Sequence, residues 1–154
     1  MKINWKSLII FLAVSLFTGG LSAIVTMGAM KEYASLNKPF LSPPEILFPI
    51  VWTILFTLMG IASYRVFESN CENKGTALTF YFVQLAVNFI WPILFFNLKL
   101  FLGAFLWLVL LWVLILITTV SFFRCDKISG YLLIPYILWV RFAGYLNFIV
   151  FLLN

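Results

Sequence analysis

The stretch FLGAFLWLVLLWVLILITTVSFF, residues 101–123, contains no charged side chain. An α-helix rises about 1.5 Å per residue, so this stretch would be roughly 35 Å long. The hydrocarbon core of a bilayer is about 30 Å thick. The sequence therefore predicts a transmembrane helix over residues 101–123.

Four other apolar segments have similar lengths and lie at about residues 7–27, 46–66, 77–98 and 129–153. Hydrophobic residues make up 64% of the chain and charged residues 10%, with a mean hydropathy of +1.11, whereas soluble domains carry about 25% charged residues. Membrane-spanning strands would show alternating segments of about ten residues instead. We expect an all-α integral membrane protein whose partner is the lipid bilayer, folded as one domain of five transmembrane helices over residues 1–154.

The first segment lacks a convincing small-residue cleavage site and is followed by four similar segments, so it is expected to be retained. Residues 28–45 form the only long connection and include Pro43 and Pro44. Prolines restrict the backbone and favour the start of a helix. This loop is expected either to cap one end of the bundle or to serve as a simple tether.

The formal charge of +5 comes from basic residues near the ends of the apolar segments. This placement is explained by membrane topology and gives no reason to expect a nucleic-acid partner. Cytoplasmic loops are enriched in lysine and arginine, which predicts a cytoplasmic N-terminus. The expected location of this multi-pass protein is a bacterial cell membrane. The basic residues on the N-terminal side are Lys2, Lys6, Arg65, Lys74, Arg124 and Lys127, and those on the other side are Lys31, Lys38 and Lys99.

Residues suited to catalysis or metal binding are scarce. The chain has no histidine, and Cys71 and Cys125 show no CxxC spacing, so both are expected to be ordinary thiols, with no metal site. No acid lies inside a span, and no GxSxG or P-loop motif is present. These features exclude a histidine-ligated haem and give no basis for a hydrolase, metalloenzyme, ATPase or proton-relay transporter. We expect no cofactor.

Polar side chains inside a membrane span are costly and therefore are candidates for function. In the third segment, Gln84, Asn88, Trp91 and Phe95 lie on one helical face, because they are spaced three or four residues apart. The stripe places amide groups beside aromatic surface. It indicates either a ligand-binding wall or amides that bond to neighbouring helices as packing contacts.

In the fifth segment, one face carries Trp139, Ala143, Leu146 and Val150, whereas Arg141 and Asn147 point elsewhere. A small residue beside a tryptophan leaves space for a flat apolar ligand. Arg141 lies about twelve residues from either end of the segment. It is expected to bind a carbonyl, a tyrosine or a ligand carboxylate, or to extend towards the interface.

Trp52 supplies a possible further wall from the second segment, although a tryptophan near the end of a span is often an interfacial anchor. Gly19 and Ala23 in the first segment have the spacing of a close helix contact, which could lie between protomers. The candidate ligand-binding residues are Trp52, Gln84, Asn88, Trp91, Phe95, Trp139, Arg141, Ala143, Leu146 and Asn147.

Three motifs, in this order, resemble those of the TspO or translocator proteins, also called tryptophan-rich sensory proteins. The first is NKPFLSPP at residues 37–44, which leads into FPIVW at residues 48–52. The second is QLAVNFIWP at residues 84–92, and the third is LIPYILWV at residues 133–140. Each motif falls on one expected helix or its preceding loop, and the similarity runs almost from end to end.

The resemblance implies a five-helix fold, commonly homodimeric, with a pocket beneath the first loop. In that family the pocket binds porphyrins and, in many members, synthetic isoquinoline or benzodiazepine ligands. The matching positions are Trp52, Asn88, Trp91, Trp139 and Ala143. The chain departs from animal members in having no basic residue after residues 146–150, which argues against their cholesterol motif at this position.

Three classes of function follow from this resemblance. The first is a receptor, sensor or carrier that binds tetrapyrroles. We infer from the charges of the chain that propionates would pair with Arg141 or Lys38. The second is an enzyme for light-dependent porphyrin breakdown, in which Trp52 and Trp139 take part. The third is a small transporter or a regulatory membrane partner. Transporters often show inverted repeats or broken helices, and neither is evident in the sequence.

Overall fold

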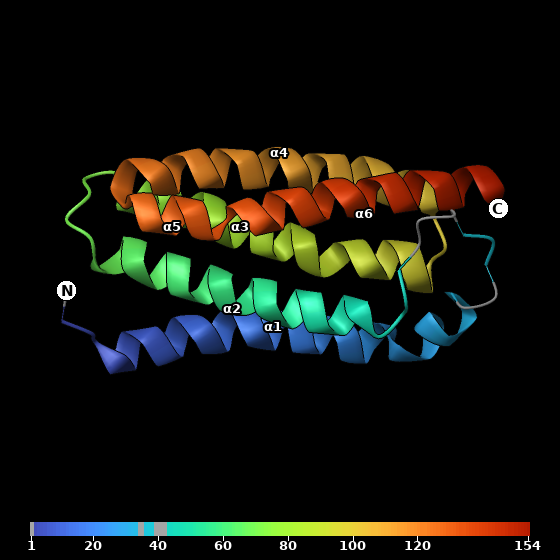
Figure 1. The fold of residues 1–154 in the computed structure, drawn as a ribbon, viewed down its shortest axis with the longest axis horizontal. Helices are drawn as coiled ribbons and strands as arrows, with labels where there is room; N and C mark the ends of the chain where they lie inside the picture. Colours follow the sequence, from blue (N-terminus) through green and yellow to red (C-terminus); the bar gives the residue numbers. More distant parts are fainter. Residues whose placement is uncertain (1, 34–35, 39–42) are drawn as a thin grey trace.

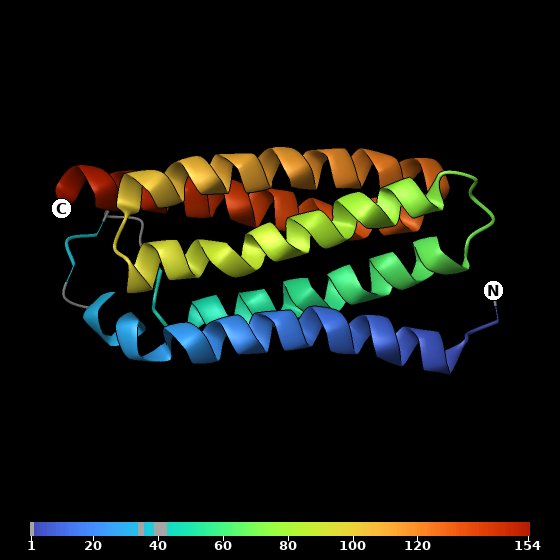
Figure 2. The same ribbon diagram turned by 180° about the vertical axis from the view of Figure 1, so that it is seen from behind.

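The computed structural model describes residues 2–33, 36–38 and 43–154 and shows a bundle of long antiparallel helices (Figure 1). Five spans in the described residues are long and apolar enough to cross a membrane, which confirms the predicted five-helix fold. The two chain ends lie at opposite ends of the bundle (Figures 1 and 2). The elements are α1 (Trp5–Tyr33), α2 (Leu47–Glu68), α3 (Lys74–Pro92), the π-helix η1 (Ile93–Asn97), α4 (Phe101–Cys125), α5 (Lys127–Leu132) and α6 (Ile134–Leu153).

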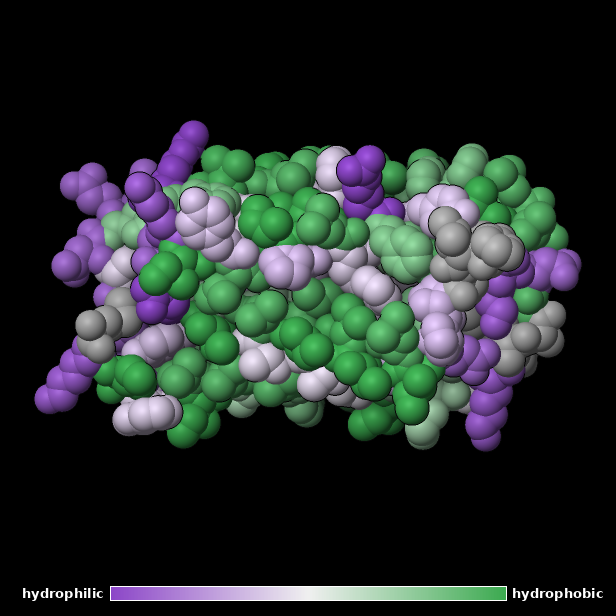
Figure 3. Space-filling view, in the orientation of Figure 1, coloured by the Kyte–Doolittle hydropathy of each residue, from purple (hydrophilic) through white to green (hydrophobic). Residues whose placement is uncertain are grey.

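The surface agrees with a protein embedded in a bilayer. Figure 3 shows a broad hydrophobic belt around the middle of the bundle and hydrophilic side chains gathered at both ends. α1 is the least buried of the five spans and exposes large apolar side chains such as Phe17 and Ile24. In water such a surface would be unfavourable, but in lipid it matches its surroundings.

Two of the spans differ most from the prediction, the first and the fifth. α1 continues to Tyr33, so part of the connection predicted at residues 28–45 is helical. Residues 34–35 and 39–42, which include the centre of the first motif, lie outside the described residues. The fifth span is divided at Leu133 into α5 and α6, because Pro135 has no N–H to donate at the start of α6. The span is therefore a broken helix, whereas a continuous one was predicted.

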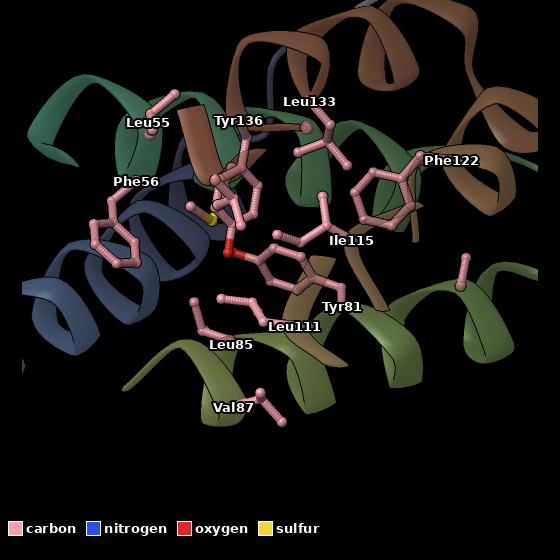
Figure 4. Packing of buried hydrophobic residues seen from close by; sticks show 14 of the residues in the cluster. Leu55, Phe56, Tyr81, Leu85, Val87, Leu111, Ile115, Phe122, Leu133 and Tyr136 are labelled. Carbon is pink, nitrogen blue, oxygen red and sulfur yellow. The ribbon is translucent and has the colours of Figure 1, made fainter. Parts of the chain in front are cut away.

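The helices enclose a buried core in which side chains from α2, α3, α4 and α6 meet (Figure 4). α1 packs mainly on α2, where Gly60 allows a close approach. A Cβ atom at Gly60 would lie 2.9 Å from the Cα of Leu12. Nearby, the Ser15 hydroxyl donates to the carbonyl oxygen of Phe56 at 2.7 Å. Small residues and hydroxyl bonds of this kind hold membrane helices together.

The end of the bundle near the N-terminus contains a covalent link. Cys71, between α2 and α3, forms a disulfide with Cys125, the last residue of α4, and their Cα atoms are 5.1 Å apart. The prediction of two ordinary thiols was wrong. The two residues are 54 positions apart in the sequence, and only the packing of α3 on α4 brings them together.

An ion pair lies at the same end of the bundle. Arg65 Nε donates to Asp126 Oδ2 at 2.7 Å, and Asp126 also caps α5 by accepting from the Ser129 backbone N–H. The hydrogen bonds from Arg65 are the main reason that the pKa of Asp126 lies below its ordinary value. The pair joins the C-terminal turn of α2 to the start of α5.

Candidate functional site

A cavity of about 310 Å³ lies between α1, α2, α3, η1 and α6. It occupies the half of the bundle where α2 begins and α3 ends. Its volume is near the lower end of the range usual for ligand pockets, about 300–1,000 Å³. Its lining consists of Gly19, Ser22, Ala23, Thr26, Met30, Glu45, Phe48, Pro49, Trp52, Phe56, Asn88, Trp91, Pro92, Phe95, Phe96, Trp139, Ala143, Leu146 and Asn147.

A chain of hydrogen bonds forms the floor of the cavity. Asn88 Nδ2 donates to Tyr136 Oη at 2.6 Å, and Tyr136 Oη donates to Gln84 Oε1 at 2.7 Å. The Gln84 side chain in turn contacts the sulfur of Met59 at 4.0 Å. Of the two amides on the α3 stripe, Asn88 thus lines the cavity and Gln84 serves as an interhelical packing contact beneath it.

A second set of hydrogen bonds fixes the wall at the C-terminal end of α3. Trp91 Nε1 donates to Asn147 Oδ1 at 3.0 Å, and Asn147 Nδ2 donates to the carbonyl oxygen of Phe101 at 2.8 Å. Pro92 follows directly and ends α3, after which the chain continues as η1. Insertions of π-helix are frequent at functional sites, and here Phe95 from η1 extends the aromatic wall.

Trp139 presents an unused donor. Its ring meets Phe48 edge-on, with the ring centroids 5.8 Å apart. Its Nε1 atom is buried and has no hydrogen-bond partner among the described residues. An unpaired buried donor costs about 1–3 kcal/mol. The Trp139 ring lines the cavity, so this donor belongs to a side chain that a ligand would contact.

The predicted site residues mostly come together. All of them line the cavity except Gln84, which lies beneath it, and Arg141, which is exposed on the outside of α6. Asn147 was predicted to point away from Trp139 but lines the same cavity. Arg141 is thus not placed to pair with a ligand propionate in the cavity.

The contribution of α1 was not predicted from the sequence. Gly19, Ser22, Ala23 and Thr26 form one side of the cavity. The only signal was the spacing of Gly19 and Ala23, which suggested a helix contact. Hydroxyls on this side are already used: Thr26 donates to the carbonyl of Ser22 at 2.8 Å. The small side chains of α1 therefore mainly provide space for a ligand and offer it few free hydrogen-bonding groups.

The charge around the cavity is low. Glu45 is the only ionisable residue among the described lining residues, and it pairs with Lys38 at 3.5 Å. The described residues contain no group of three or more histidine, cysteine, aspartate or glutamate side chains that could hold a metal ion. The arrangement suits a largely apolar, aromatic ligand with a hydrogen-bond acceptor.

Comparison with known proteins identifies the relatives of the chain. The sequence model of the TspO/MBR family matches residues 9–153. The chain belongs to the TspO/MBR family. Its relatives include Protein CrtK of Rhodobacter capsulatus, 44% identical over 88% of this chain and 85% of the relative. The tryptophan-rich sensory protein of Cereibacter sphaeroides is 36% identical over 100% of this chain and 95% of the relative.

The TspO/MBR relatives extend to animals. The translocator protein of Sus scrofa is 32% identical over 95% of this chain and 89% of its own length. Membership and the five apolar spans together establish an integral, multi-pass membrane protein.

Proposed function

We propose that the cavity binds flat hydrophobic ligands of the tetrapyrrole class, and that the protein acts as their membrane receptor, sensor or carrier. The observation that carries this proposal is an aromatic cavity lined by Trp139, whose buried indole N–H has no hydrogen-bond partner among the described residues. Such a site offers stacking surface and one directed hydrogen bond. Isoquinoline- and benzodiazepine-like molecules are also flat and hydrophobic, and we propose them as further ligands.

The proposed binding mode uses three walls. Trp52, Trp91 and Trp139 stack against the ligand, and Trp139 donates its indole N–H to a ligand acceptor. The Asn88 amide, held by Tyr136, supplies a polar group at the floor. Propionate groups would remain outside the apolar cavity and pair with Lys38, in place of its ion pair with Glu45.

Protoporphyrin binding provides the direct test. Titration of the detergent-purified protein with protoporphyrin should quench tryptophan fluorescence in a saturable manner. Trp139→Phe keeps an aromatic ring but removes the donor, and should weaken binding about fivefold to tenfold. Trp5→Phe is the control, because Trp5 is exposed near the N-terminus, and it should leave the affinity unchanged. Unsaturable quenching, or full affinity in Trp139→Phe, would contradict the proposal.

A light-dependent degradation activity is the alternative. Trp52 and Trp139 both line the cavity, so both would lie against a bound porphyrin. The same titration repeated under illumination separates the two functions. We expect the porphyrin spectrum to match that of a protein-free sample under the same light. A new product that forms only with the protein would favour the enzyme.

We also propose a cytoplasmic N-terminus and a homodimer in a bacterial cell membrane. The distribution of basic residues supports the orientation. The disulfide between Cys71 and Cys125 argues against it, because disulfides persist mainly in oxidising compartments. Both cysteines lie at the end of the bundle near the N-terminus.

Thiol labelling of intact cells decides the orientation. With a cytoplasmic N-terminus, a membrane-impermeant maleimide should label Cys71 and Cys125 only after permeabilisation and reduction. Leu98→Cys, placed in a chain that lacks both native cysteines, is the control because Leu98 is exposed at the opposite end. It should react in intact cells. Labelling of the native cysteines in intact cells treated with an impermeant reductant would establish the opposite orientation.

A further inference from the structure

Arg141 is the only charged residue of α6, and the cavity makes no use of it. Its side chain is exposed, and it forms no hydrogen bond or ion pair with the described residues. Ionisable side chains within a span are rare and nearly always pair with another group. An unpaired arginine on the lipid-facing side of the bundle therefore requires a partner from outside the described chain.

The orientation of α6 keeps Arg141 away from the cavity. Trp112 Nε1 on α4 donates to the carbonyl oxygen of Ile137, one turn before Arg141. Asn147, further along α6, bonds to Phe101 and Trp91. Ala143 is two residues from Arg141 and so lies on nearly the opposite side of the helix. Arg141 could reach the ligand only if α6 rotated by about half a turn and lost these bonds.

The residues around Arg141 form a continuous exposed stripe, spaced by three or four residues. Apart from Arg141, the stripe is apolar or aromatic. Figure 3 looks onto the side of the bundle that carries α6 and shows a small hydrophilic patch within the hydrophobic belt. With Arg141, the stripe consists of Ile134, Leu138, Tyr145, Phe148 and Leu152.

Arg141 lies near the middle of the fifth span, Lys127–Leu153. It is twelve residues from Leu153, the last residue of α6, or about 18 Å along the helix. It is about as far from Lys127, the start of the span. Half the thickness of the hydrocarbon core is about 15 Å. A lipid phosphate at the interface is therefore further away than an extended arginine side chain reaches.

A second copy of the chain does not supply the missing anion. A two-fold contact through this stripe would bring Arg141 towards its own counterpart, and like charges repel. No acidic residue of the chain lies at the depth of Arg141. The five acids, Glu32, Glu45, Glu68, Glu72 and Asp126, lie at the ends of spans or beyond them.

We propose that this stripe of α6 binds a transmembrane helix of another protein that carries an aspartate or glutamate near mid-membrane. The arginine fork pairs well with a carboxylate. The surrounding leucine, isoleucine and aromatic side chains provide the packing that joins helices in lipid. Pairing removes the cost of an isolated charge from both helices.

Energy transfer to synthetic helices tests this surface. The full chain is placed in phosphatidylcholine vesicles, and its tryptophans serve as donors to a dansyl group on a leucine-alanine transmembrane peptide. Three peptides differ only at the central residue, which is Asp, Asn or Leu. The Asp peptide should bind about tenfold more tightly than the Leu peptide. The Arg141→Leu variant should bind all three peptides equally.

Two matched variants show whether the preference for Asp depends on the charge at Arg141. Arg124 is also exposed and forms no ion pair with the described residues, but it lies in the last turn of α4. Arg124→Leu should therefore keep the preference. Arg141→Leu should retain the wild-type melting temperature and protoporphyrin affinity, which shows that it is folded. Equal binding of the Asp and Leu peptides by the wild type would overturn the proposal. Equal binding of the Asn and Asp peptides by the wild type would also overturn it. So would a preference for the Asp peptide that appears only when the vesicles contain phosphatidylglycerol.

Discussion

Replacing Ala143 by phenylalanine is expected to reduce protoporphyrin affinity at least a hundredfold, which corresponds to about 2.8 kcal/mol. Ala143 is 5% exposed and lines the cavity one turn from Trp139. A phenyl ring at this position would occupy a large part of a cavity of only about 310 Å³. The ligand would lose both space and access to the Trp139 indole. Fluorescence titration of the purified variant measures the effect.

Two matched variants make this result interpretable. Leu138→Phe introduces the same ring on the outside of α6, where Leu138 is exposed, and should leave binding unchanged. Ala143→Gly keeps the space and should retain binding within a few fold. Ala143→Phe should also melt at a temperature close to that of the wild type, because the cavity beside Ala143 can accept the ring. Wild-type affinity in Ala143→Phe would show that the ligand binds elsewhere.

The bundle could be predicted because the bilayer sets the length of each span. Residues 101–123 are apolar for long enough to cross it, and the structure places α4 over Phe101–Cys125. Helical periodicity also placed Asn88, Trp91 and Phe95 on one face of the third segment, and all three line the cavity. Both inferences depend on properties of a single helix, which sequence spacing records directly.

The features that the sequence did not reveal depend on contacts between helices. Gln84 shares a face with Asn88 but lies one turn deeper, where Tyr136 from α6 fills the space. The spacing of residues along α3 shows which of them share a face, but it does not show how far the cavity extends along that face. The Cys71–Cys125 bond likewise depends on how α3 packs against α4.

The division of the fifth span had a visible cause in Pro135, since a proline removes a backbone donor. Pro135 alone does not show that the helix is interrupted, because membrane helices often accommodate a proline without a break. The role of α1 is a different case. Gly19 and Ala23 have no chemistry of their own, and only the helices around them turn small side chains into a cavity wall.

Replacing Gly60 by leucine is expected to destabilise the protein by about 3 kcal/mol or more, the upper part of the range for overpacking. A Cβ atom at Gly60 would lie 2.9 Å from the Cα of Leu12 and 2.8 Å from the Ser15 hydroxyl oxygen. A backbone atom cannot move aside without displacing α1 as a whole. The free energy of unfolding in mixed micelles, followed by circular dichroism, measures this loss.

The same substitution should also weaken ligand binding, because displacement of α1 moves Ser22 and Thr26 away from the cavity. Gly20→Leu is the matched control on α1: a Cβ atom at Gly20 meets nothing within 4 Å. It should leave both stability and affinity near wild type, since leucine is also the better helix former. If Gly60→Leu and Gly20→Leu behaved alike, the close contact of α1 and α2 at Gly60 would not hold α1 against the cavity. A loss confined to Gly60→Leu would show that this contact determines one wall of the site.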